Sequence, residues 1–151
     1  MIELLVVVAL IGLVSAAVLL TLRPAERPLT SEDLTLELRE QMIILSQRAI
    51  STQRWTGVSF THQAYQLWDY QESKWQRIAK EQDYSIPSAF TLRIEQDGSE
   101  ISLPSEIPDT PLIFIAPDGR IDAFTLEIDD GDLISTLNDP YWFSPHQEDE
   151  S

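Results

Sequence analysis

The sequence predicts an α+β protein in which a long N-terminal hydrophobic helix precedes a head with an antiparallel β-sheet or sandwich. Residues 4–22 contain no charged side chain. Residues 31–52 carry apolar side chains at three- and four-residue spacing, the period of an amphipathic helix. From Trp55 onward, short β-type runs alternate with turns. Because no helical pattern separates these runs, the strands are expected to pair antiparallel.

Composition excludes several classes of function. The 151 residues fit one domain, and 43% of them are hydrophobic, which is enough for a core. The chain has 25 acidic and 10 basic side chains, a formal charge of -15, which argues against binding nucleic acid or an anionic lipid surface. Cysteine is absent and there are only two histidines, so disulfides, thiolate catalysis and Cys-based or multi-histidine metal sites are not expected. We expect no cofactor, no metal and no catalytic residue.

The first element is an apolar helix over residues 1–22. Its 19 uncharged positions would span about 28 Å, close to the ~30 Å of a bilayer's hydrocarbon core. Apolar side chains cover every face, and so small a domain could hardly enclose such a helix. A cleavable signal peptide is disfavoured because its apolar core is shorter and follows basic residues. We interpret the segment as a transmembrane helix that also serves in assembly.

Residues 23–30 form a break, since Pro24 and Pro28 each remove a backbone donor. Thr30 or Ser31 can cap a second helix, with Asp33 completing a capping box. That helix runs to about residue 52. Its apolar stripe comprises Leu34, Leu38, Met42, Leu45 and Ala49, widened by Leu36, Ile43, Ile44 and Ile50. We expect the stripe to pack on a sheet; the alternative is a groove for a partner helix.

The head is expected to cover residues 31–151 and to end in an acidic tail. Its predicted strands are residues 58–60, 64–70, 75–78, 90–94, 101–103, 112–115, 124–128 and a last short one near 133–134. The turns between them contain Asp, Gly, Pro and Ser signals, for example at residues 96–98, 117–119 and 129–132.

The N-terminal sequence MIELLVVVALIG resembles the first helix of type IV pilins and type II secretion pseudopilins. In that family a prepilin peptidase cuts after a glycine, and the mature chain begins with Phe, two further residues, Ile and Glu. Ile2 and Glu3 match this Ile-Glu pair, so we expect Met1 to stand at the third mature position, behind a basic leader. The resemblance implies N-methylation and a pairing of Glu3 with the N-terminal amine of an adjacent subunit.

The head resembles the H-type minor pseudopilins (the GspH family), and minor pilins share a similar layout. The residues that carry this resemblance are YQLW at 65–68, Trp75, PLIF at 111–114 and PDG at 117–119. It implies a structural subunit of the type II secretion pseudopilus, in protein export across the outer membrane. The implied location is a single pass through the inner membrane with a periplasmic head. The implied partners are other pseudopilins in a hetero-oligomeric filament tip, inner-membrane lipid and the prepilin peptidase.

Two alternatives stay open: a minor pilin of a type IV pilus, and a membrane-tethered periplasmic binding domain. An enzyme is not expected, because His62 and His146 lack local partners that would mark a catalytic base. Two side-chain sets have a functional and a structural interpretation. Asp129, Asp130 and Asp132 could offer oxygens to calcium, but a solvated turn is favoured. Trp55, Trp68, Trp75 and Trp142 could form a sugar- or peptide-binding platform, but core packing is favoured.

Overall fold

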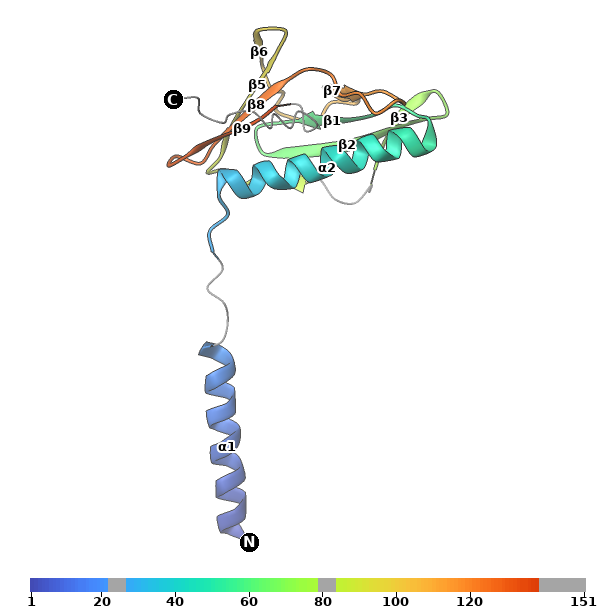
Figure 1. Ribbon diagram of the computed structural model, residues 1–151. Helices are drawn as coiled ribbons and strands as arrows, with labels where there is room; N and C mark the ends of the chain where they lie inside the picture. Colours follow the sequence, from blue (N-terminus) through green and yellow to red (C-terminus); the bar gives the residue numbers. More distant parts are fainter. Residues whose placement is uncertain (22–26, 79–83, 139–151) are drawn as a thin grey trace, which may run out of the picture.

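The computed structural model describes residues 1–21, 27–78 and 84–138, and of residues 14–21 the backbone only. Helix α1 (Ile2–Thr21) stands apart from the head in Figure 1. The head contains α2 (Ser31–Thr52), β1 (Thr56–Phe60), β2 (Ala64–Gln71), β3 (Lys74–Arg77), β4 (Tyr84–Ser85), β5 (Thr91–Gln96), β6 (Ser99–Ile101), β7 (Ile113–Ile115), β8 (Thr125–Asp129) and β9 (Ile134–Leu137). Among the helices of the described residues, none combines the length and the apolar sequence that crossing a membrane requires.

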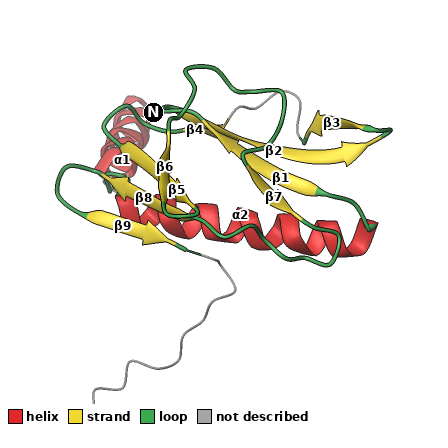
Figure 2. Ribbon diagram, turned by 90° about the horizontal axis from the view of Figure 1, so that it is seen from above, coloured by secondary structure: helices red, strands yellow, loops and turns green. Residues whose placement is uncertain are grey.

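The nine strands of the described residues form two antiparallel sheets. In the first sheet the order is β3-β2-β1-β7, with β4 pairing to β2; in the second sheet it is β6-β5-β8-β9. Figure 2 shows α2 running along both sheets, with β8 and β9 beside its first half and β1 and β7 beside its second half. One helix thus joins the two sheets into one head. The predicted α+β class, with a long N-terminal helix and antiparallel sheets, is confirmed.

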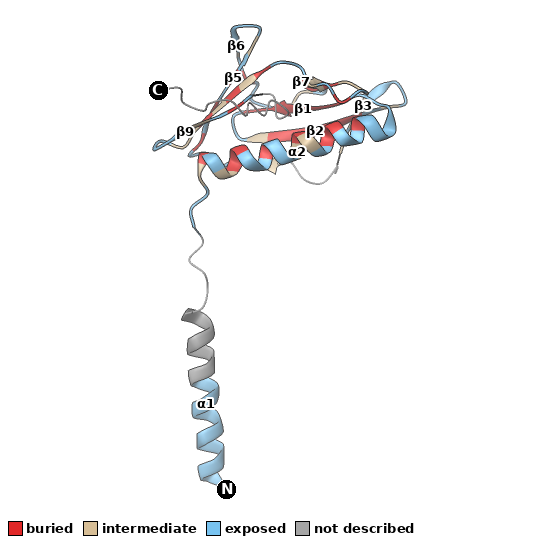
Figure 3. Ribbon diagram, viewed as in Figure 1, coloured by how far each residue is buried: buried red, intermediate tan, exposed pale blue. Residues whose placement is uncertain are grey.

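The side of α2 that faces the sheets supplies much of the core. Its five predicted stripe residues are each at most 1% exposed: Leu34, Leu38, Met42, Leu45 and Ala49. They pack with inward-facing side chains of both sheets. Figure 3 shows buried positions recurring at intervals along α2, separated by exposed ones.

The predicted widening of this stripe is wrong. Leu36, Ile44 and Ile50 are 51%, 55% and 48% exposed, and Ile43 is half-buried. Both sheets lie on the same side of α2, and the positions buried beside the stripe are Thr35 and Ser46 rather than the predicted Leu36, Ile44 and Ile50. Periodicity locates a buried row but does not fix how wide the contact is.

Most strand boundaries differ from the prediction by one to three residues. The last strand starts at Ile134, because Asp130 and Leu133 close a turn through their backbones at 3.2 Å. The short strand β4 was not predicted, and β6 ends at Ile101, before the buried Leu103.

A buried ion pair joins α2 to the first sheet. Asp69, on β2, is 1% exposed, and its Oδ2 accepts from Arg48 Nε at 3.1 Å and Nη2 at 2.9 Å. Gln71 Nε2 donates to the same oxygen at 2.7 Å. Asp69 Oδ1 has no hydrogen-bond partner among the described residues. The carboxylate therefore depends on Arg48 for both its charge balance and two of its three hydrogen bonds.

The turn after β7 approaches α2 closely at Gly119, whose φ is +86°. Ser46 Oγ donates to the Gly119 carbonyl at 2.8 Å. A Cβ at this position would lie 2.7 Å from Ile50 Cδ1 and 2.9 Å from Ser46 Oγ. The backbone angle therefore favours glycine here, and a Cβ would also require the Ile50 and Ser46 side chains to move.

Candidate assembly site

Helix α1 presents an apolar surface that nothing in the described head covers. Every described side chain of residues 1–13 is exposed, including Ile2 at 76%, Leu4 at 71% and Val6 at 53% (Figure 3). Soluble monomers rarely leave a continuous apolar surface of this kind in water. The surface is therefore suited to contact with lipid or with apolar helices of other chains.

Glu3, the one site residue predicted from the sequence, lies in the first turn of this helix. A carboxylate there is favoured by the positive end of the helix dipole. Within the part of the chain that the structure describes, no basic side chain forms an ion pair with Glu3. Its pairing with the amine of a neighbouring subunit stays a prediction.

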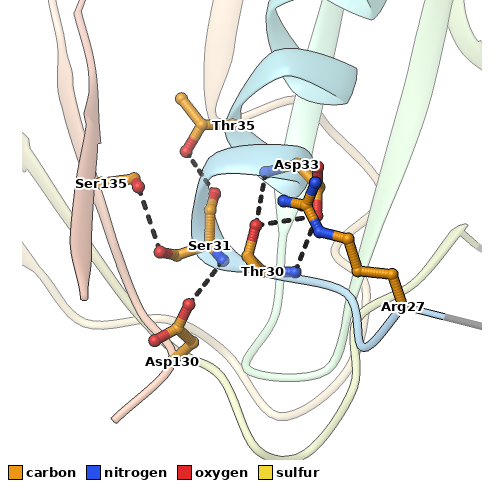
Figure 4. A network of polar contacts seen from close by, with 7 residues as sticks. All are labelled: Arg27, Thr30, Ser31, Asp33, Thr35, Asp130 and Ser135. Atoms are coloured by element: carbon orange, nitrogen blue, oxygen red, sulfur yellow. Dashed lines mark hydrogen bonds and ion pairs between the residues drawn. The ribbon is translucent and has the colours of Figure 1, made fainter. Parts of the chain in front are cut away.

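The start of α2 is fixed first by its own residues (Figure 4). Thr30 is the N-cap: its Oγ1 accepts from the Asp33 N–H at 3.2 Å, and its own N–H donates to Asp33 Oδ2 at 3.0 Å. The predicted capping box is therefore confirmed. The hydrogen bonds from the Thr30 side chain and backbone hold the pKa of Asp33 below its usual value. Arg27 lies 3.6 Å from the same carboxylate.

The next residue, Ser31, connects α2 to the turn between β8 and β9. The Ser31 N–H donates to Asp130 Oδ2 at 2.7 Å, and Ser31 Oγ lies 3.2 Å from the Leu133 carbonyl and 3.1 Å from Ser135 Oγ. Asp130 Oδ1 accepts from the N–H groups of Leu133 at 2.8 Å and Asp132 at 3.0 Å. Hydrogen bonds from the backbones of Ser31, Leu133 and Asp132, in that order of effect, lower the pKa of Asp130 strongly.

The interpretation of the aspartate turn as merely solvated was therefore incomplete. Asp129 Oδ1 accepts from the Gly131 N–H at 2.8 Å, as in an ordinary Asx turn, whereas Asp130 fixes the start of a helix 99 residues earlier in the chain. The described residues contain no group of three or more His, Cys, Asp or Glu side chains that could hold a metal ion.

The tryptophans divide between core and surface. Trp68 is 3% exposed, and its Nε1 donates to Ser59 Oγ at 2.8 Å, as the core interpretation expects. Trp55 is 44% exposed and Trp75 half-buried, and both line one surface cleft. The core interpretation is wrong for Trp55. His62 is exposed, and Trp142 and His146 lie outside the described residues.

Comparison with known proteins identifies the fold. No protein-family model matches the chain, and no curated protein matches it. The structure is similar to that of the minor pseudopilin EpsH from the type 2 secretion system of Vibrio cholerae, with a TM-score of 0.56 and 16% identity over 68% of this chain and 81% of that chain. A crystal structure of the same minor pseudopilin gives a TM-score of 0.55 and 16% identity over 70% of this chain and 91% of that chain. The chain thus has the pilin-like fold of a pseudopilin.

Proposed function

We propose that this chain is a minor pseudopilin, a structural subunit of a type II secretion pseudopilus that takes part in protein export across the outer membrane. The observation that carries the proposal is the combination of an uncovered apolar helix with a head that has the fold of a known minor pseudopilin. The role is assembly rather than catalysis. Its partners are other pseudopilins, joined in a hetero-oligomeric filament tip.

In this proposal the chain has three parts. Residues 1–22 hold the subunit in the inner membrane and then pack into the filament, residues 23–30 form the break, and residues 31–151 form a periplasmic head. The uncharged sequence of residues 4–22 supports the membrane position. Processing and N-methylation by a prepilin peptidase rest on the match of Ile2 and Glu3 to the family pattern.

Glu3 selects the neighbour and the register of the helix. Packing apolar helices together gains little from the hydrophobic effect when they leave lipid, because lipid is equally apolar. A charge pair in that low-dielectric setting is strong, and an unpaired carboxylate there is costly. Glu3 therefore favours the one arrangement that places an amine of the adjacent subunit beside it.

The test is Glu3→Ala, expressed in a strain that lacks the native subunit. We expect the head to fold normally, because Glu3 makes no contact with it. We expect co-purification with other pseudopilins, and secretion, to fall at least about tenfold, because removing one partner of a buried charge pair is strongly destabilising. The matched control is Glu32→Ala, which removes an exposed acid from the first turn of α2.

Two results would contradict the proposal. If Glu3→Ala is incorporated and secretes like the parent, Glu3 has no role in assembly. If loss of the chain abolishes piliation while secretion is unchanged, the chain is a minor pilin of a type IV pilus. The similarity to secretion-system pseudopilins supports the first system over the second.

A further inference from the structure

An aromatic cleft opens on the head, away from the assembly helix. It has a volume of about 550 Å³ and is lined by Trp55, Tyr70, Trp75, Phe114 and Asp122. Trp55 and Tyr70 are 44% and 37% exposed, so their rings are accessible to solvent. Its volume is within the range of about 300–1,000 Å³ that is typical of ligand sites.

The cleft lies on the face of the first sheet opposite α2. The neighbouring Thr56 donates its hydroxyl to the Leu45 carbonyl of α2, so Thr56 faces the helix. Because side chains alternate between the faces of a strand, Trp55 and Gly57 face away from α2. In the strand register Gly57 pairs with Phe114. A Cβ at Gly57 would lie 2.5 Å from Pro111 Cβ, so the glycine makes room for Pro111 to pack on this face beside the rings.

The rings line an open cleft and are inclined to one another rather than coplanar. Tyr70 and Trp75 are cross-strand partners, with ring centroids 5.1 Å apart and planes at 61°. Trp75 and Phe114 approach to 5.7 Å with planes at 59°. Because the rings are inclined to one another, a small ligand in the cleft can contact the face of more than one ring. This geometry suits a compact cation better than a flat sugar ring.

Asp122 gives the cleft a negative charge that no cation of the described chain balances. Its Oδ2 accepts from the Phe114 N–H at 3.3 Å, and its own N–H donates to the Phe114 carbonyl at 3.0 Å, which fixes it beside the rings. Among the described residues, no Lys or Arg forms an ion pair with Asp122, and none lines the cleft. The chain's formal charge of -15 adds a long-range attraction for cations.

The same sheet face already holds a guanidinium group on an indole. Arg77, paired in register with Trp68, lies over the Trp68 ring at 5.7 Å from its centroid. The pair of Tyr70 and Trp75 is the next pair on that face, two residues along each strand. The chain therefore shows cation–π contact one step away from the cleft.

We propose that the cleft of Trp55, Tyr70, Trp75, Phe114 and Asp122 binds a Lys or Arg side chain presented by a partner protein. The aromatic rings contact the methylene stem and the cationic group of that side chain, and the Asp122 carboxylate forms an ion pair with it. This site goes beyond assembly through α1, since it lies on a separate part of the molecule. Either proposal can fail while the other holds.

The test uses the full chain in detergent, labelled with 5-fluorotryptophan and observed by ¹⁹F NMR. The probes are N-acetyl-lysine methylamide and N-acetyl-arginine methylamide, compared with the neutral side-chain-acetylated lysine and with methyl glucoside. We expect saturable shifts of the Trp55 and Trp75 signals with the two cations, and no shift with the neutral compounds. The buried Trp68 signal should not move, which also reports that the head is folded.

Asp122→Asn should weaken binding of both cations by at least about threefold, since the amide keeps the bond to Phe114 but loses the charge. The matched control is Asp97→Asn in the β5–β6 turn, which removes the same charge elsewhere and should leave binding unchanged. Trp55→Leu should weaken binding further. The proposal is overturned if acetylated lysine binds as well as lysine, if the glucoside binds and the cations do not, or if Asp122→Asn behaves like Asp97→Asn.

Discussion

Replacing Arg48 with methionine should destabilise the head by about 3 kcal/mol. The change removes two of the three hydrogen bonds to Asp69 Oδ2. It also deprives the Asp69 carboxylate of its counter-ion, although that side chain is only 2% exposed. Breaking a buried ion pair by removing one partner costs about 3–5 kcal/mol. The Arg48 side chain is itself 42% exposed, so water can enter in its place, and we expect the lower end of that range. The midpoint of thermal unfolding should fall by about 10 °C.

The assay is guanidinium unfolding of the full chain at constant detergent, followed by tryptophan fluorescence. The control is Arg93→Met, which breaks a surface pairing with Glu100 and Glu127 at 3.6 and 3.5 Å and should cost less than about 1 kcal/mol. The double variant Arg48→Met with Asp69→Leu should recover most of the lost stability, because it removes the buried charge as well. The reasoning would be refuted if Arg48→Met lost no more stability than Arg93→Met. It would also be refuted if the stability lost by the double variant equalled the sum of the losses of the two single variants.

Two further predictions concern the packing of α2. Gly119→Ala should lower the free energy of unfolding by about 2 kcal/mol in the same assay, because it combines the strain of a positive φ with a Cβ placed against α2. The control Gly131→Ala has a positive φ but open space around it, and should cost about half as much. Equal losses for the two variants would contradict the packing argument. Asp130→Asn should make the free energy of unfolding depend less on pH in acid. The lowered pKa of Asp130 contributes stability that is present above about pH 4 and is lost as the pH falls. The stabilities of parent and variant should therefore converge in acid and differ at pH 7. A constant difference between pH 7 and pH 3 would contradict that account.

Local signals in the sequence predict α2 and most strand positions. Thr30 and Asp33 lie three residues apart, so their reciprocal hydrogen bonds can be read from spacing alone. The buried row from Leu34 to Ala49 follows from helical period, and the alternation of Leu92 and Ile94 follows from strand period. These features depend on neighbours a few residues away.

The features that sequence reasoning missed depend on distant neighbours. Ser31 and Asp130 meet across 99 positions, which no local pattern encodes. Trp55 lies beside Tyr70, whose N–H donates to the Trp55 carbonyl at 2.9 Å, and the register of β2 and β3 places Trp75 opposite Tyr70. The exposure of Leu36 and Ile44 follows from both sheets lying on one side of α2. Each needs the tertiary arrangement before it can be recognised.

The contact between Ser31 and Asp130 determines how mechanical tension passes into the head. Residues that precede α2 contact the head first at Asp33, through Thr30 and Arg27. At the next residue, Ser31, the backbone N–H is held by Asp130 of the turn between β8 and β9, whereas the carbonyl accepts from the Thr35 hydroxyl at 2.7 Å within α2. Pulling force therefore reaches the second sheet directly, before the helix has to unwind.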